Sequence, residues 1–140
     1  MTLRSISACL VSGAMLLGAG PALAQEPSER AAERLAQYQE TGETRSCVSL
    51  SRVSSITPLD DNHFLFEMRG GDVYLNRIRG RCNQAASAFT RIEYRVSGSQ
   101  LCRGEIVNVV DNSTGLTAGA CGFGDFERLE RIEDRDAGSR

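Results

Sequence analysis

Hydrophobic and polar positions alternate over much of the chain after Arg45, with a period of two. This period is typical of β-strands, because successive side chains of a strand point to opposite faces of a sheet. The clearest segments are residues 63–69 and 72–78, which Gly70-Gly71 joins. Glycine adopts positive φ at little cost, so this pair predicts a tight two-residue hairpin turn that places Met68 opposite Val73. One face of the hairpin then carries Phe64, Phe66, Met68, Val73 and Leu75, and the other carries Leu65, Glu67, Arg69, Asp72, Tyr74 and Asn76.

Further strands are expected on both sides of this hairpin. They cover residues 47–50 and 53–56 with a kink between them, and then 88–96, 105–110 and 116–123. Residues 105–110 are apolar on both faces, which indicates a central, buried strand. The polar segment Asp111–Gly115 is expected to form a loop.

Two short helices are expected at the ends of this β region. Pro27 suits a first helical turn, and the pattern from there to about Gln39 predicts a helix. Phe126, Leu129 and Ile132 recur at a spacing of three, which is typical of a second helix. The whole pattern predicts a mainly β fold, α+β at the margin: a small antiparallel β barrel or sandwich of about six strands with a short N-terminal helix.

The first 24 residues have the pattern of a cleavable secretory signal. Arg4 supplies a positive start, an apolar run extends from about Ile6 to Leu17, and Ala22-Leu23-Ala24 supplies a small-residue cleavage site. The apolar run is shorter than the ~20 residues that a membrane-spanning helix needs. We therefore expect cleavage after Ala24, a periplasmic or secreted mature protein, and no membrane span after cleavage.

The expected organisation has four parts. Residues 1–24 form the signal, 25–44 the N-terminal helix and lead-in, 45–126 a disulfide-bonded β domain, and 127–140 a charged C-terminal tail.

Cysteine use supports an oxidised domain. After loss of Cys9 with the signal, the mature chain keeps Cys47, Cys82, Cys102 and Cys121. An even number of cysteines in an exported chain implies disulfides, and four cysteines allow three pairings. We expect Cys47–Cys82 and Cys102–Cys121, because the second pair flanks what the pattern predicts to be a hairpin.

Charge and residue usage exclude several classes of function. All 16 basic side chains are arginines, and the mature chain has 15 of them against 18 acidic residues. Nucleic-acid-binding proteins show a basic excess, so no nucleic-acid partner is expected. The absence of lysine excludes Schiff-base chemistry and Walker-type phosphate loops.

Little in the sequence indicates catalysis. The single histidine, His63, lies near Asp60 and Asp61, but one histidine with two turn carboxylates is a weak metal set. No Gly-x-Ser-x-Gly nucleophile motif occurs. We therefore assign no catalytic residue, no metal site and no cofactor.

Three alternating arginines form the most suggestive binding candidate. In an extended segment, Arg77, Arg79 and Arg81 would share one side, where planar guanidinium groups could hold phosphate or carboxylate groups. The alternative interpretation is a solvated strand end before Cys82.

The spacing of several short motifs resembles a known family. These motifs include the four cysteines, Tyr74-Leu75-Asn76-Arg77 and Cys121-Gly122-Phe123-Gly124-Asp125-Phe126. From Cys47 to Phe126 the chain resembles a family of small exported four-cysteine bacterial proteins classed as a domain of unknown function. The resemblance implies a secreted or periplasmic location and no particular activity, ligand or catalytic residue.

Three hypotheses about function follow. The first is a non-enzymatic binding module of the cell envelope, whose partner is an envelope protein or an anionic surface component. The second is an inhibitor of an envelope hydrolase that presents the loop Asp111–Gly115. The third is a hydrolase that uses His63, and it requires a pocket that joins His63 to a hydroxyl and a carboxylate.

Overall fold

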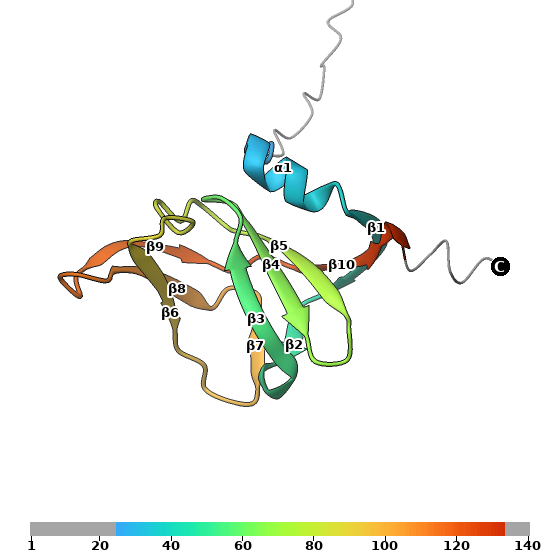
Figure 1. The fold of residues 1–140 in the computed structure, drawn as a ribbon. Coiled ribbons are helices and arrows are strands. Elements are labelled where there is room, and N and C mark those ends of the chain that lie inside the picture. Colours follow the sequence, from blue (N-terminus) through green and yellow to red (C-terminus); the bar gives the residue numbers. More distant parts are fainter. Residues whose placement is uncertain (1–24, 134–140) are drawn as a thin grey trace, which may run out of the picture.

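The computed structural model describes residues 25–133, so the expected signal of residues 1–24 lies outside the described part of the chain. One short helix precedes ten strands (Figure 1). In chain order the elements are α1 (Glu29–Leu35), β1 (Tyr38–Arg45), β2 (Cys47–Ser49), a 3-10 turn (Leu50–Arg52), β3 (Val53–Pro58), β4 (His63–Met68), β5 (Val73–Arg77), β6 (Thr90–Tyr94), β7 (Gln100–Cys102), β8 (Ile106–Asp111), β9 (Thr117–Gly122) and β10 (Phe126–Arg131).

The strands form three antiparallel sheets. The largest has the order β1-β10-β5-β4-β3, the second is the pair β2-β7, and the third has the order β6-β8-β9. The expected mainly β, antiparallel fold with a short N-terminal helix is confirmed, and β8 is the central strand of its sheet as expected. The sheets do not close into a barrel.

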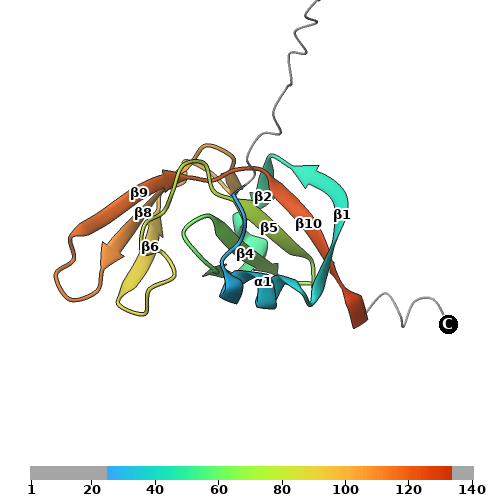
Figure 2. The ribbon, with the colours of Figure 1, turned by 90° about the horizontal axis from the view of Figure 1, so that it is seen from above.

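Two apolar clusters lie on opposite faces of the five-stranded sheet. The inter-sheet core faces the other two sheets, and Phe123 lies at its centre, with ring centroids 5.5 Å from Phe66 and 6.3 Å from Phe126. The helix-side core lies beneath α1 (Figure 2) and contains Ala31, Tyr38, Leu59, Leu65, Val73, Leu75 and Leu129. The inner strands β10, β5 and β4 of the five-stranded sheet therefore bury side chains on both faces.

This double burial explains why the predicted hairpin register is wrong by one residue. Gly70 and Gly71 do have positive φ, but Phe66 pairs with Tyr74 rather than with Leu75. The loop is longer than expected, since the N–H of Met68 donates to the carbonyl of Asp72. A one-residue slip usually exposes apolar side chains, but here both faces receive them.

The expected C-terminal helix is also wrong, because Phe126–Arg131 is strand β10. Phe126 enters the inter-sheet core and Leu129 the helix-side core. In a strand buried on both faces, residues three apart occupy opposite faces, so a spacing of three does not by itself indicate a helix. The region expected as lead-in contains the edge strand β1, which pairs with β10.

The predicted disulfide pairing is wrong as well. The bonds are Cys47–Cys102 and Cys82–Cys121. Cys47 lies directly opposite Cys102 in the β2-β7 ladder. The expected hairpin between Cys102 and Cys121 is present as β8-β9, but Cys102 lies in β7, which belongs to another sheet than β9, so the hairpin does not bring the two cysteines together.

No helix within residues 25–133 has the length and apolar character needed to cross a membrane.

Candidate functional site

The loop Asp111–Gly115 joins β8 to β9 and is held by its own hydrogen bonds. The Oδ1 atom of Asp111 accepts the backbone N–H groups of Ser113 and Thr114 at 2.9 and 2.8 Å, and it also accepts both of their hydroxyls. Gly115 has a φ of +70°, and its N–H donates to the carbonyl of Asp111. The carboxylate therefore fixes the loop as an Asx-type turn.

These bonds change the acidity of Asp111. The hydroxyl of Ser113, followed by the N–H of Thr114, stabilises the carboxylate and lowers the pKa of Asp111 to about 2. The carboxylate is therefore ionised at neutral pH, and its charge is directed to groups of the loop itself.

Backbone contacts also tie the loop to the strands on either side. The N–H of Asn112 donates to the carbonyl of Phe89, and the N–H of Asp111 donates to the carbonyl of Leu116, each at 2.9 Å. A guanidinium N–H of Arg91 reaches the side-chain oxygen of Asn112 at 3.3 Å. The end of the three-stranded sheet is thus preorganised on both flanks.

Two large apolar side chains project beside this fixed loop. Phe89 is 77% exposed and Leu116 is 70% exposed. They precede β6 and β9, which flank β8, so two strand spacings, on the order of 10 Å, separate their backbones. We call Phe89, Asp111–Gly115 and Leu116 the tip. In Figure 2 the loop between β8 and β9 projects away from the five-stranded sheet.

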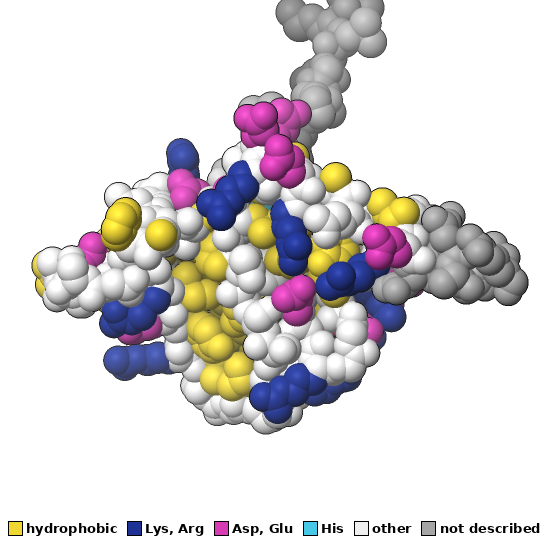
Figure 3. All heavy atoms as spheres, in the orientation of Figure 1, with side chains coloured by type: hydrophobic (Ala, Val, Ile, Leu, Met, Phe, Trp, Pro, Cys, Tyr) yellow, Lys and Arg dark blue, Asp and Glu magenta, His cyan; other side chains and the backbone are white. Residues whose placement is uncertain are grey.

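A second apolar surface adjoins β6. Partly buried side chains from β3 and β6 pack against the inter-sheet core, and Figure 3 shows a strip of hydrophobic side chains between these two strands. The partly buried side chains that pack against this core are Val53, Ile56, Ile92, Tyr94 and, just after β6, Val96. β3 and β6 are both at sheet edges, so each has backbone groups that no strand of residues 25–133 pairs.

The three arginines that were predicted to bind an anion differ in the partners of their side chains. Arg77 pairs with Glu127 at 3.0 Å and with Glu40 at 2.6 Å, and Arg81 pairs with Asp61 at 3.1 Å. Gly80 has a φ of +82°, so residues 77–81 are not the continuous extended segment that the pattern assumed.

Arg79 joins two sheets through its backbone. Its N–H donates to the carbonyl of Gly122, and the N–H of Gly122 donates back, at 2.8 and 3.2 Å. Its guanidinium makes no ion pair within the described residues. One of the three arginines is therefore free to bind an anion, and the other two already hold carboxylates.

His63 lies inside the protein rather than in a pocket. Its side chain is 1% exposed, and Nδ1 lies 2.9 Å from Oδ1 of Asp60. Asp60 also accepts the backbone N–H groups of Ser28 and Asn62, so it fixes the turn before β4 and the start of α1. The pair has a structural role here, and no group of three or more metal-ligating side chains occurs within residues 25–133.

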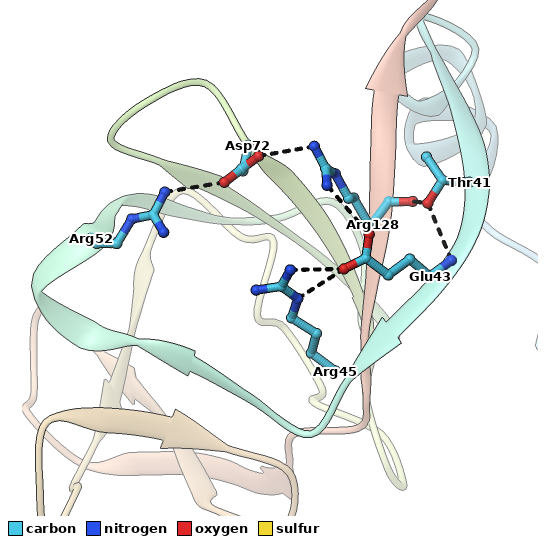
Figure 4. Close-up of polar contacts among 6 residues, drawn as sticks. All are labelled: Thr41, Glu43, Arg45, Arg52, Asp72 and Arg128. Atoms are coloured by element: carbon cyan, nitrogen blue, oxygen red, sulfur yellow. Dashed lines mark hydrogen bonds and ion pairs between the residues drawn. The ribbon is translucent and has the colours of Figure 1, made fainter.

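A larger ionic network fastens the edge strand β1. Glu43 binds Arg45 and Arg128, and Asp72 binds Arg128 and Arg52 (Figure 4). Hydrogen bonds from the guanidinium of Arg45, and then from that of Arg128, lower the pKa of Glu43. These contacts join β1 to β10 and to the β4-β5 turn, so we assign the network a role in stabilising the fold.

Sequence reasoning identified the Asp111–Gly115 loop and missed both of its apolar flanks. Phe89 lay within a segment expected to be a strand, and Leu116 began another. The sequence feature that could have indicated their exposure is a large apolar residue close to a polar turn, because turns lie at the surface.

No family model, curated protein or solved structure matches this chain.

Proposed function

We propose that this protein is a non-enzymatic binding module that works in the periplasm or outside the cell and binds a partner protein through the tip. The observation that carries the proposal is the rigid Asp111–Gly115 loop with Phe89 and Leu116 exposed on either side. Two disulfides are consistent with an oxidising compartment.

The chemistry of the tip indicates the kind of partner surface. Burial of a phenylalanine or leucine side chain is worth roughly 1.5–3 kcal/mol, and this gain is not realised in the free protein. A preorganised loop loses little conformational entropy when it binds. The charge of Asp111 is already directed to its own loop. An apolar concave surface on the partner would complement these features.

The test is capture with matched variants. The disulfide-bonded protein is immobilised and incubated with envelope and culture fractions of the source cells, and the retained protein is identified, purified and titrated. We expect Phe89→Ser with Leu116→Ser to weaken its affinity at least tenfold, as for central apolar contacts of an interface. The control is Ile106→Ser with Ile132→Ser, which changes two exposed isoleucines outside the tip. Equal affinity of both variants would overturn the proposal.

A second candidate function uses the same surface. A rigid loop that enters an active site is a suitable design for an inhibitor of an envelope hydrolase, because its conformation is fixed before binding. If the captured partner is a hydrolase, wild-type protein should inhibit it and the Phe89/Leu116 variant should not. If the protein binds the hydrolase without inhibiting it, the function as a binding module is supported and the function as an inhibitor is excluded.

A further inference from the structure

A separate pocket lies between α1 and the five-stranded sheet. Its volume is about 340 Å³, which is within the range of small-molecule sites. The lining residues are Pro27, Ala32, Leu35, Tyr38, Glu40, Leu75, Arg77 and Leu129. None of them belongs to the tip, so this site is independent of the proposed function.

The pocket has a mainly apolar interior, in which the buried hydroxyl of Tyr38 has no hydrogen-bond partner within residues 25–133. Leu75, Leu129 and Tyr38 come from three neighbouring strands and are 1%, 4% and 7% exposed, so they form its base. Ala32 and Leu35 on α1 are more exposed and lie at the opening. A ligand would therefore be held mainly by apolar contact with the sheet.

The only charged groups in the lining are already balanced. Arg77 binds Glu40 at 2.6 Å, and on its other side it binds Glu127 at 3.0 Å. An anionic ligand would have to displace one of these carboxylates from the guanidinium. A cation would have to compete with Arg77 itself.

From these observations we infer that the pocket binds a small, uncharged, mainly apolar molecule, with any polar end placed at the Tyr38 hydroxyl or at the Glu40–Arg77 pair. Contact with the apolar interior provides most of the affinity. Because Glu40 and Arg77 neutralise each other, they can offer hydrogen bonds at the rim but no net charge. The volume suits a molecule of about two fused rings and is too small for a peptide helix.

Two fluorescent probes of the same shape test the charge class. Phenylnaphthylamine is uncharged, and anilinonaphthalene sulfonate adds one sulfonate to the same ring system. We expect saturable, one-to-one binding of phenylnaphthylamine and at least tenfold weaker binding of the sulfonate. Tighter binding of the sulfonate would show that Arg77 is available to anions and would overturn the inference.

Two alanines, one in α1 and one at its C-terminal cap, test the location. Ala32 lines the pocket, whereas Ala36 is also exposed but lies outside the lining. Ala32→Trp should fill the opening and weaken phenylnaphthylamine binding at least tenfold, and Ala36→Trp should leave it within twofold. Thermal unfolding of both variants checks that they are folded.

Other outcomes are equally decisive. Non-saturable fluorescence, or equal binding by Ala32→Trp and Ala36→Trp, would remove the pocket as a ligand site. Loss of probe binding in the Phe89/Leu116 variant would instead assign the probe to the tip. None of these fluorescence measurements uses the captured partner protein, so failure of this inference and failure of the proposed function are distinguishable.

Discussion

Asn76 and Gly124 exchange two hydrogen bonds inside the protein. The side-chain amide of Asn76 donates to the carbonyl of Gly124 at 3.0 Å, and the N–H of Gly124 donates to the side-chain oxygen of Asn76 at 2.8 Å. Asn76 is fully buried. The side-chain amide therefore makes the two hydrogen bonds that a neighbouring strand would make to the backbone of Gly124. Gly124 lies between β9 and β10, just before Phe126 pairs with Asn76.

Replacing this amide should destabilise the domain. Asn76→Ala leaves the N–H and the carbonyl of Gly124 buried without these partners, so we expect a loss of about 2–4 kcal/mol in the free energy of unfolding. Urea denaturation measures it, with the exposed Asn83→Ala as the control. A loss as small as that of the control would show that the pair is not important for stability.

Gly124 should tolerate no side chain. A Cβ atom at this position would lie 2.0 Å from the carbonyl oxygen of Arg77, and backbone cannot move aside cheaply. We expect Gly124→Ala to lower stability by several kcal/mol, on the order of the largest core substitutions. Gly98→Ala is the matched control, because nothing lies within 4 Å of its added Cβ. Equal midpoints of thermal unfolding for the two variants would contradict the close approach.

The disulfide pairing can be read directly by mass spectrometry. Cleavage after arginine places each cysteine in a separate peptide: 46–52, 82–91, 96–103 and 104–128. We expect 46–52 linked to 96–103, and 82–91 linked to 104–128. A link between 46–52 and 82–91 would contradict the structure.

Removal of either bond should lower stability. The sequence separations are 55 and 39 residues. In the chain-entropy model, loops of this size correspond to about 4 kcal/mol each. Denaturation of the Cys47→Ser/Cys102→Ser and Cys82→Ser/Cys121→Ser variants measures both contributions, and an unchanged unfolding midpoint in either would exclude a stabilising role for that bond.

Stability should depend on the ionisation of Asp60. Burial acts to raise the pKa of Asp60, but the N–H groups of Ser28 and Asn62 and the side chain of His63 outweigh it, so the pKa lies below the ordinary 3.8. A carboxyl with a lowered pKa stabilises the fold above its unfolded pKa, and this contribution disappears as the pH falls through the folded pKa.

The measurement is the unfolding midpoint as a function of pH. We expect the wild type to lose stability below about pH 4 more steeply than Asp60→Asn, whose amide does not titrate. Parallel curves for the two proteins would show that Asp60 contributes nothing to the acid response.

Local signals in the sequence were sufficient for most elements and insufficient for their pairing. Period two located the strands of the hairpin, and the β-branched run 105–110 identified the central strand β8. Register was not predictable, because Phe66 and Leu65 are both buried, on opposite faces, and no pattern then distinguishes one face from the other.

Long-range contacts account for the remaining errors. β1 is charged and mostly exposed, so its strand character depends on pairing with β10, which no local pattern encodes. Cys47 meets Cys102 because β2 pairs with β7 across 55 residues. For the candidate site, the polar loop was recognisable from Asp111 to Gly115, but the exposure of Phe89 and Leu116 depends on which strands flank β8.

The alternating order of the two disulfides has a consequence for resistance to proteases. Cys82 lies between Cys47 and Cys102 in the sequence, and Cys102 lies between Cys82 and Cys121. A single cut anywhere from residue 48 to residue 120 therefore leaves every piece covalently joined. With consecutive pairing, one cut between Cys82 and Cys102 would have released two fragments. A copy of this protein that is cut once between Cys47 and Cys121 can thus keep all three sheets and the tip in one molecule, and its two pieces separate only after reduction.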